Sequence, residues 1–258
     1  NVAAYMGGGP KSAIYRSDDG GESWKKLSSG LPGGSIGKIG LAISFQQPDV
    51  VYAVIELNRR AGGIYRSTDR GNSWERRSDD VSGATGPHYY QKLYAPPHQF
   101  DRIYLMDEYI RFSVDGGRSF TRVNIDFRHG DSHALAFKSS DPDYIMLGDD
   151  GGLYESFDQA ENWRFMGNLP VSQFYKVAVD DAEPFYNIYG GSQDSGTQGG
   201  PSRTDNLHGI QNSDWRIVLD WDGHQQLAEA ILDGESAETL NHMKQLVHDG
   251  VPLTELSA

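Results

Sequence analysis

The chain has 258 residues, a formal net charge of −13 and no cysteine. The negative charge argues against a nucleic-acid partner, because proteins that bind phosphate backbones usually present a basic face. The lack of cysteine excludes disulfides, thiolate metal sites and a cysteine nucleophile. No apolar run approaches the roughly 18 residues of a membrane span. We expect no cofactor.

The N-terminal residues 2–6 resemble the inside of a strand, and Asn1 is not a translation start. We therefore expect a processed or truncated N-terminus, from which an export signal has been lost.

One pattern, Ser-x-Asp-x-Gly-x-Ser-aromatic, recurs at intervals of about 45 residues, a period typical of repeat folds. The copies, here called the Ser-Asp turns, span residues 17–24, 67–74, 113–120 and, with Ala160 and Asn162 replacing glycine and serine, 156–163. Ser and Asp side chains readily bond nearby backbone N–H groups. We predict that Asp19, Asp69 and Asp115 do so within their own turns. A calcium loop is the alternative at Asp19, but the carboxylates of such a loop are missing.

Strand-like runs around these turns divide the chain into four-stranded antiparallel units, with each turn joining a third strand to a fourth. The first whole unit comprises residues 36–44, 50–57, 63–67 and 74–77, the second 89–95, 102–106, 109–113 and 120–123, and the third 132–137, 144–147, 153–156 and 163–166. The fourth comprises 174–179 and 185–189, a Gly- and Asn-rich excursion through 193–212, and 215–219. Residues 1–28 supply the back half of an earlier unit. The total is about four and a half units.

The apolar spacing changes to a helical period after His224. We predict a helical hairpin within residues 225–258, with an apolar stripe that includes Leu227, Ile231, Leu240, Met243 and Val247. The sequence therefore predicts two parts, residues 1–224 and a helical tail of 225–258. The tail faintly resembles the helical cap of cobalamin-binding modules. We expect instead that it covers a sheet edge or is a fused segment.

The Ser-Asp turns resemble those of Asp-box (BNR repeat) β-propellers, which include sialidases, xyloglucanases and the sortilin-type luminal domain. The resemblance covers about residues 1–224. Bacterial secreted sortilin-like repeat proteins are similar also in the stretches 129–133, 148–152, 173–175 and 191–194. The resemblance implies an all-β fold of propeller blades. With about four and a half blades in this chain, we expect the propeller to be incomplete or a fragment. The resemblance also implies an extracytoplasmic protein, secreted or periplasmic. Because these turns occur in proteins of different activity, they leave the function open.

Two functions follow from the resemblance. One is a propeller that recognises glycan or peptide ligands at one rim, with glycoside-hydrolase activity if it is an enzyme. The other is a non-catalytic, sortilin-like protein-interaction scaffold. Catalytic residues cannot be transferred from the family, because the sialidase Arg-Ile-Pro and xyloglucanase Arg-Thr-Asp motifs are missing. The cysteine-rich module that follows the sortilin domain is missing as well.

Strand order places the loops before each first strand, and those between second and third strands, on the rim opposite the Ser-Asp turns. His, carboxylate and aromatic residues gather in these loops, as a binding mouth requires. The predicted catalytic carboxylates are Asp131, Asp149, Asp194 and Asp222. The predicted ligand-binding residues are Glu56, His88, Tyr89, His129, His133, Asp150, Gln193 and His224.

Three interpretations of this rim remain open. Two carboxylates could act as acid and base on a glycoside, at a separation of roughly 5–9.5 Å. His129, Asp131 and His133 could hold a divalent metal if both histidines lie on one face of a strand, although we expect no metal. The residues could instead cap loops and line a solvated channel. The partners expected are a polysaccharide or peptide and, through open sheet edges, a second copy of the chain.

Overall fold

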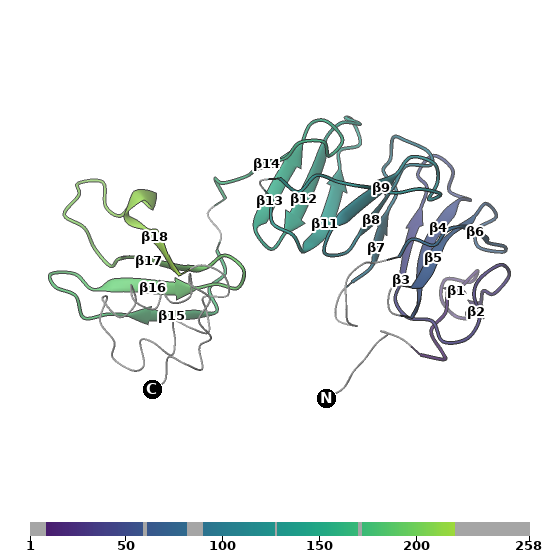
Figure 1. The fold of residues 1–258 in the computed structure, drawn as a ribbon, viewed down its shortest axis with the longest axis horizontal. Helices are drawn as coiled ribbons and strands as arrows, with labels where there is room; N and C mark the ends of the chain where they lie inside the picture. Colours follow the sequence, from purple (N-terminus) through teal and green to yellow (C-terminus); the bar gives the residue numbers. More distant parts are fainter. Residues whose placement is uncertain (1–8, 59–60, 82–89, 127, 170–171, 220–258) are drawn as a thin grey trace. The chain divides into compact units, whose positions relative to one another are not determined.

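The computed structural model describes residues 9–58, 61–81, 90–126, 128–169 and 172–219 (Figure 1). Regular structure in these residues is almost entirely β, arranged as one two-stranded and four four-stranded antiparallel sheets. The chain divides into two compact units, residues 1–167 and residues 168–258.

The first unit contains the two-stranded sheet and three four-stranded sheets. The strands are β1 (Tyr15–Arg16) and β2 (Lys25–Lys26); β3 (Ile39–Ile43), β4 (Val51–Asn58), β5 (Ala61–Ser67) and β6 (Glu75–Ser78); β7 (Lys92–Tyr94), β8 (Ile103–Met106), β9 (Ile110–Ser113) and β10 (Thr121–Arg122); and β11 (Ser132–Phe137), β12 (Ile145–Asp149), β13 (Gly152–Ser156) and β14 (Arg164–Phe165). In every sheet the strands pair in sequence order.

The second unit has one sheet, made by β15 (Lys176–Val179), β16 (Asn187–Gly191), β17 (Thr197–Pro201) and β18 (Arg216–Leu219), with the short 3-10 helix η1 (Asn212–Asp214) before β18. Strand β17 lies inside the segment 193–212 that the sequence predicted to be an irregular excursion, so this part of the prediction is wrong. The strand lacks the apolar alternation expected of a strand because it contains glycines, and aromatic rings from other parts of the unit fill the space above them. A Cβ on Gly199 would lie 2.8 Å from Tyr189, and one on Gly200 would lie 2.6 Å from Trp215.

Four antiparallel sheets with strands in sequence order confirm the prediction of an all-β fold made of propeller blades. The helical hairpin, and the boundary at residues 224 and 225, fall within 220–258 and lie outside the described residues. Among the described residues, no helix is both long and apolar enough to cross a lipid bilayer.

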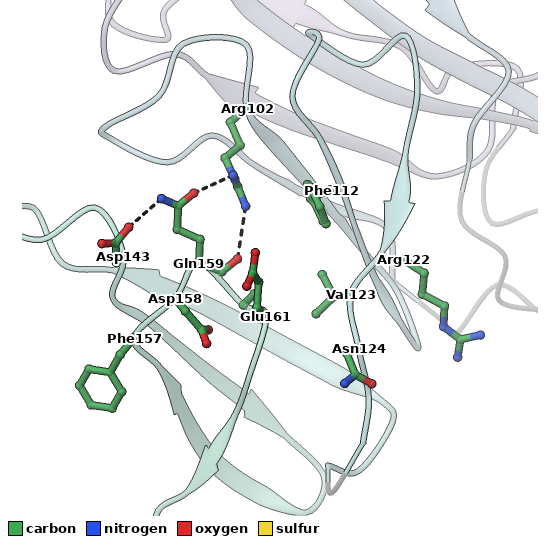
Figure 2. Close-up of a pocket in the computed structure, with 11 residues that line it drawn as sticks. Arg102, Phe112, Arg122, Val123, Asn124, Asp143, Phe157, Asp158, Gln159 and Glu161 are labelled. Carbon is green, nitrogen blue, oxygen red and sulfur yellow. Dashed lines mark hydrogen bonds between the residues drawn. The ribbon is translucent and has the colours of Figure 1, made fainter.

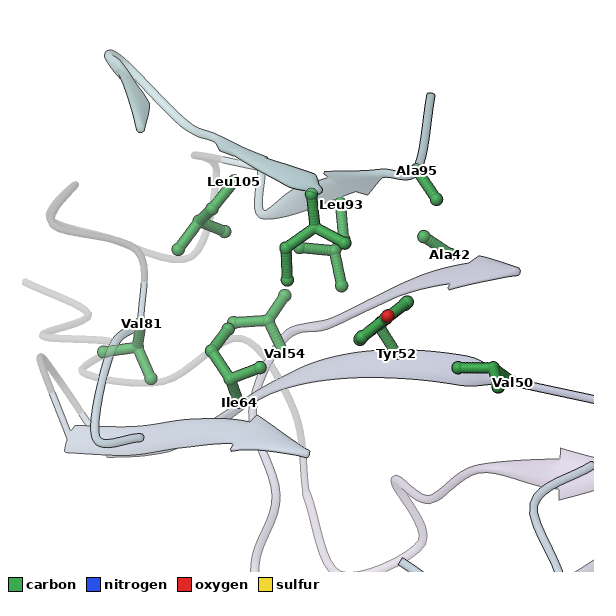
Figure 3. Packing of buried hydrophobic residues seen from close by; sticks show 10 residues of the cluster. Ala42, Val50, Tyr52, Val54, Ile64, Val81, Leu93, Ala95 and Leu105 are labelled. Carbon is green, nitrogen blue, oxygen red and sulfur yellow. The ribbon is translucent and has the colours of Figure 1, made fainter. Parts of the chain in front are cut away.

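The cores of the first unit lie between neighbouring blades. Val54 and Ile64 of the blade β3–β6 pack against Leu93 and Leu105 of the blade β7–β10 (Figure 3). A second core joins β7–β10 to β11–β14 through Met106 and other buried residues. Each fully buried side chain of this size contributes about 1.5–3 kcal/mol. Interblade packing is therefore what holds the blades of the first unit together.

The Ser-Asp turns form the hydrogen bonds that the sequence predicted. In the second turn, the Asp69 carboxylate accepts hydrogen bonds from the Ser73 N–H at 2.8 Å and the Ser73 hydroxyl at 2.6 Å. The Ser67 hydroxyl accepts one from the Gly71 N–H at 2.7 Å. Asp19 and Asp115 accept the corresponding backbone hydrogen bonds at 2.9 and 3.0 Å, which confirms the prediction for all three aspartates. Bonds from Ser73 and Ser67 lower the pKa of Asp69 to about 2.

An arginine of the preceding blade binds the backbone of each of the last three Ser-Asp turns. Arg16 donates to the Arg70 carbonyl at 2.9 Å. Arg77 donates to the carbonyls of residues 115 and 116, both at 3.1 Å, and Arg102 donates to the Gln159 carbonyl at 3.2 Å. The turns therefore join adjacent blades as well as closing their own hairpins.

Candidate functional site

Each blade has two ends, which carry different groups. Because the strands are antiparallel, the turn between second and third strands lies at the end opposite the Ser-Asp turn. We call this end the loop edge and the other the turn edge. In the blade β11–β14, Ser132 pairs with Asp149 across the loop edge. The Ser132 N–H also donates to the Glu108 carbonyl of the preceding blade at 3.4 Å.

A buried ion pair supports this loop edge. Arg128 Nη1 lies 3.3 Å from Asp149 Oδ2, and both side chains are fully shielded from solvent. The same nitrogen donates to the Ser132 hydroxyl at 2.9 Å. The other Asp149 oxygen accepts the Gly151 and Gly152 N–H groups at 2.9 and 3.1 Å. The pair thereby ties the segment before β11 to the β12–β13 turn.

Burial disfavours the charged form of both partners, and it therefore shifts their pKa values in opposite directions. Burial raises the pKa of Asp149 to about 6, although Arg128 and the Gly151 N–H oppose the shift. Burial lowers the pKa of Arg128. The Asp149 side chain is shielded from solvent and does not form part of the exposed surface of this edge.

His133 and Asp150 form the exposed part of the loop edge. His133 Nε2 lies 2.6 Å from Asp150 Oδ1, and both side chains reach solvent. His133 occupies a β-bulge, since the residues on either side of it pair with consecutive residues of β12. Bulges commonly redirect a side chain at a functional edge. The centroids of the Tyr90 ring and the His133 imidazole lie 4.9 Å apart, and Lys92 Nζ lies 5.0 Å from the centroid of the Tyr90 ring.

Asp131 lies beside this pair on a strained backbone. Its φ is +46°, in the left-handed region that non-glycine residues rarely adopt. Its Oδ1 is buried and accepts no hydrogen bond from the described residues. Burial raises its pKa, and the negative charges of Asp150 and Glu108 raise it further. A carboxyl whose pKa is shifted by burial and by neighbouring charges is a candidate for a functional role.

The His129 side chain does not share the strand with His133. β11 begins at Ser132, so the strand-face argument for a metal held by His129, Asp131 and His133 is wrong. The left-handed turn at Asp131 separates the two histidines. His129 Nδ1 lies 3.3 Å from the Gly130 carbonyl. Across the described ranges, no group of three His, Asp or Glu residues is arranged to hold a metal ion.

The other predicted site residues belong to other blades or lie outside the described residues. Glu56 is buried in the first whole blade, where its carboxylate accepts the Lys38 N–H at 3.0 Å. Gln193 and Asp194 form the β16–β17 turn of the second unit, at the loop edge of that blade. The predicted residues that lie outside the described part of the chain are His88, Tyr89, Asp222 and His224.

A pocket of about 640 Å³ opens at the turn edge, between the blades β7–β10 and β11–β14 (Figure 2). Its lining comprises Arg102, Phe112, Arg122, Val123, Asn124, Asp143, Phe157, Asp158, Gln159, Ala160 and Glu161. The Gln159 side chain bridges two of these groups, since it accepts from Arg102 at 2.7 Å and donates to Asp143 at 2.7 Å.

Two features of the first unit, Arg128 and the pocket, were not predicted from the sequence. Arg128 lies outside the motifs, and nothing in its neighbourhood indicates a buried guanidinium. The pocket did leave a signal, because its wall includes the fourth Ser-Asp turn, the copy that departs from the pattern at Ala160 and Asn162.

Comparison with known proteins gives structural matches only. No family model matches the chain, and no curated protein matches it. A GH74 enzyme of Niastella koreensis matches with a TM-score of 0.47 and 14% identity, over 85% of this chain and 38% of the enzyme. The GH74 xyloglucanase of Xanthomonas campestris matches with a TM-score of 0.48 and 15% identity, over 83% and 36%. YCF48 from Cyanidioschyzon merolae matches with a TM-score of 0.38 and 14% identity, over 69% and 54%. The chain therefore spans about two fifths of the GH74 proteins or less.

Proposed function

We propose that this chain is part of an exported β-propeller that recognises glycans at the loop edge formed by residues 128–133 and 149–152. The observation that carries the proposal is the His133–Asp150 pair, 2.6 Å apart and open to solvent. A sugar hydroxyl both donates and accepts hydrogen bonds. A carboxylate beside an imidazole offers both kinds of partner, and the neighbouring Tyr90 adds an aromatic ring.

Support for the proposal comes from the rigidity beneath this pair. The buried Arg128–Asp149 pair fixes both backbone segments from which His133 and Asp150 project. Binding sites of high precision need such support, because a loosely held site must first be ordered by its ligand. The exposed pair is thus preorganised.

Binding of immobilised polysaccharides and of a peptide library tests the proposal. We expect wild-type protein to retain a glycan, and His133→Ala and Asp150→Asn to weaken that binding at least fivefold. Asp141→Asn is the matched control, since it removes an exposed carboxylate that lies beside Lys138, at the other end of the same blade. Binding of peptides alone, or equal effects of Asp150→Asn and Asp141→Asn, would contradict glycan recognition here.

Glycoside hydrolysis is a second candidate function, and Asp131 favours it. A glycosidase needs a carboxyl that stays protonated beside one that is ionised. Asp131 is a partly buried carboxyl whose pKa is raised by burial and by the nearby carboxylates of Asp150 and Glu108, so more than one carboxyl is present at this edge. Release of reducing ends from the bound polysaccharide is the measurement, and Asp131→Asn should abolish it. Binding without release would support the non-catalytic function.

A further inference from the structure

The pocket at the turn edge shares no residue with the loop-edge site. Its volume of about 640 Å³ lies within the range of roughly 300–1,000 Å³ that is typical of small-molecule sites. It is built from β9 and the chain around β10 of one blade, and from the fourth Ser-Asp turn of the next (Figure 2).

Part of the lining is apolar. Val123 and Ala160 are buried, and the partly buried Phe112 lies beside them. Ala160 has a φ of +77° at the position that glycine occupies in the other three Ser-Asp turns. An alanine at such a φ is strained, and its methyl group adds to the apolar surface in this turn.

Both arginines of the lining are already engaged. Arg102 donates to Tyr104 Oη at 2.9 Å and to Gln159 Oε1 at 2.7 Å, and it stacks over Phe112. The Arg122 guanidinium lies 3.8 Å from the centre of the Tyr109 ring. Neither guanidinium therefore depends on an anionic ligand to be satisfied.

The carboxylates have capacity left for hydrogen bonds. Glu161 is exposed, and its side chain makes no hydrogen bond within the described ranges. Asp143 uses Oδ1 to accept from Gln159 at 2.7 Å. The exposed Asn124 lies across the pocket from Glu161 (Figure 2). The pocket therefore carries an open acceptor on one wall and an amide on the other.

The mixture of charges decides the class of ligand. Asp143, Asp158 and Glu161 oppose an anion, while Arg102 and Arg122 oppose a cation. A wholly apolar ligand would displace water from these polar groups without replacing its hydrogen bonds, at a cost of about 1–3 kcal/mol for each unsatisfied group. The ligand that remains is neutral, rich in groups that donate and accept, and apolar on one side. A saccharide has hydroxyl groups at its rim and C–H groups on its faces.

We propose that this pocket is a second binding site, for a short neutral saccharide. Its hydroxyl groups donate to Glu161 and Asp143 and accept from the Asn124 amide, while its C–H face lies against Phe112 and Val123. This proposal rests on the proposed function in one respect only, namely that the ligand is a glycan. The two sites use different residues, so each can be tested separately.

Calorimetric titration of the full chain with cellotetraose, xylotetraose and mannotetraose tests the second site. We expect at least one tetraose to bind, and Glu161→Ala to weaken that binding about tenfold, as the loss of a hydrogen bond to a charged group does. Glu22→Ala is the matched control, since Glu22 has the same position in the first Ser-Asp turn and lies outside the pocket. Both side chains are exposed, so unfolding midpoints should be unchanged.

The outcomes separate the two sites. Weaker binding by Glu161→Ala, with Asp150→Asn and Glu22→Ala like wild type, supports the pocket even if the loop edge binds no glycan. Loss of binding in Asp150→Asn alone supports the loop edge and overturns the pocket proposal. No binding of any tetraose to wild type at millimolar concentration, or equal binding by Glu161→Ala and wild type, also overturns it.

Discussion

Arg128 Nη1 and Asp149 Oδ2 lie 3.3 Å apart, and neither side chain is exposed. A buried charge that loses its partner typically destabilises a protein by about 3–5 kcal/mol. We expect Arg128→Ala to lower the free energy of unfolding of the first unit by this amount, as measured by urea denaturation. Arg118→Ala, at an exposed position in the third Ser-Asp turn, is the control and should cost less than about 0.5 kcal/mol. Similar losses in both variants would show that the pair contributes no stability.

The pKa of Asp149 predicts a pH dependence. Its ordinary value of 3.8 rises to about 6 in the folded chain. Between these values the folded state binds a proton that the unfolded state does not, so stability falls as pH rises from about 4 to 6, by up to about 3 kcal/mol. Asp149→Asn cannot titrate and should lack this part of the slope in urea denaturation across that range. Asp141→Asn should keep the wild-type slope.

Alanine substitutions at two glycines distinguish the cost of a strained backbone from the cost of a steric clash. Gly117 and Gly21 occupy the same position in two Ser-Asp turns, with φ values of +86° and +99°. A Cβ on Gly117 would lie 2.6 Å from Ile64 Cγ2, whereas one on Gly21 meets nothing closer than 3.8 Å. Alanine at either position costs about 1–2 kcal/mol for the left-handed backbone. Gly117→Ala should cost about 1–3 kcal/mol more. Equal losses in the unfolding free energy would contradict the packing argument.

The contacts of Arg102, which bonds to the Ser-Asp turn of the next blade, indicate that lysine cannot replace it. Its guanidinium donates at once to Gln99, Gln159 and Tyr104. One ammonium group cannot reproduce this geometry. Arg102→Lys should lower the free energy of unfolding by about 1–3 kcal/mol, while Arg118→Lys should leave it unchanged. Guanidinium denaturation of both variants is the measurement.

Most of the blade structure could be predicted from the sequence because the Ser-Asp turns are local. The hydrogen bonds of their serine and aspartate side chains connect residues at most four positions apart, so the pattern itself determines the hairpin. Strand β17 could not be predicted in this way. Its glycines are covered by Tyr189 and Trp215, which are distant in sequence, and no local alternation signals this packing.

The candidate site could be predicted only in part. Strand order correctly places Asp131, Asp149 and His133 at one edge of the blade β11–β14. Sequence cannot distinguish the buried Asp149 from the exposed Asp150, since burial depends on where Arg128 lies. The irregular fourth Ser-Asp turn marks one wall of the pocket, but the pocket itself depends on two blades meeting, which a motif within one blade does not encode.

The middle blade of the first unit has neighbours on both faces, and this predicts its kinetic behaviour. β8 contributes Ile103 and Leu105 to one core and Tyr104 and Met106 to the other, and all four residues are buried. In an array whose elements contact only their neighbours, opening proceeds most readily from the ends. The amide hydrogens of β8 should therefore exchange with deuterated solvent more slowly than those of β2, whose residues are exposed. Its protection should approach that set by global unfolding.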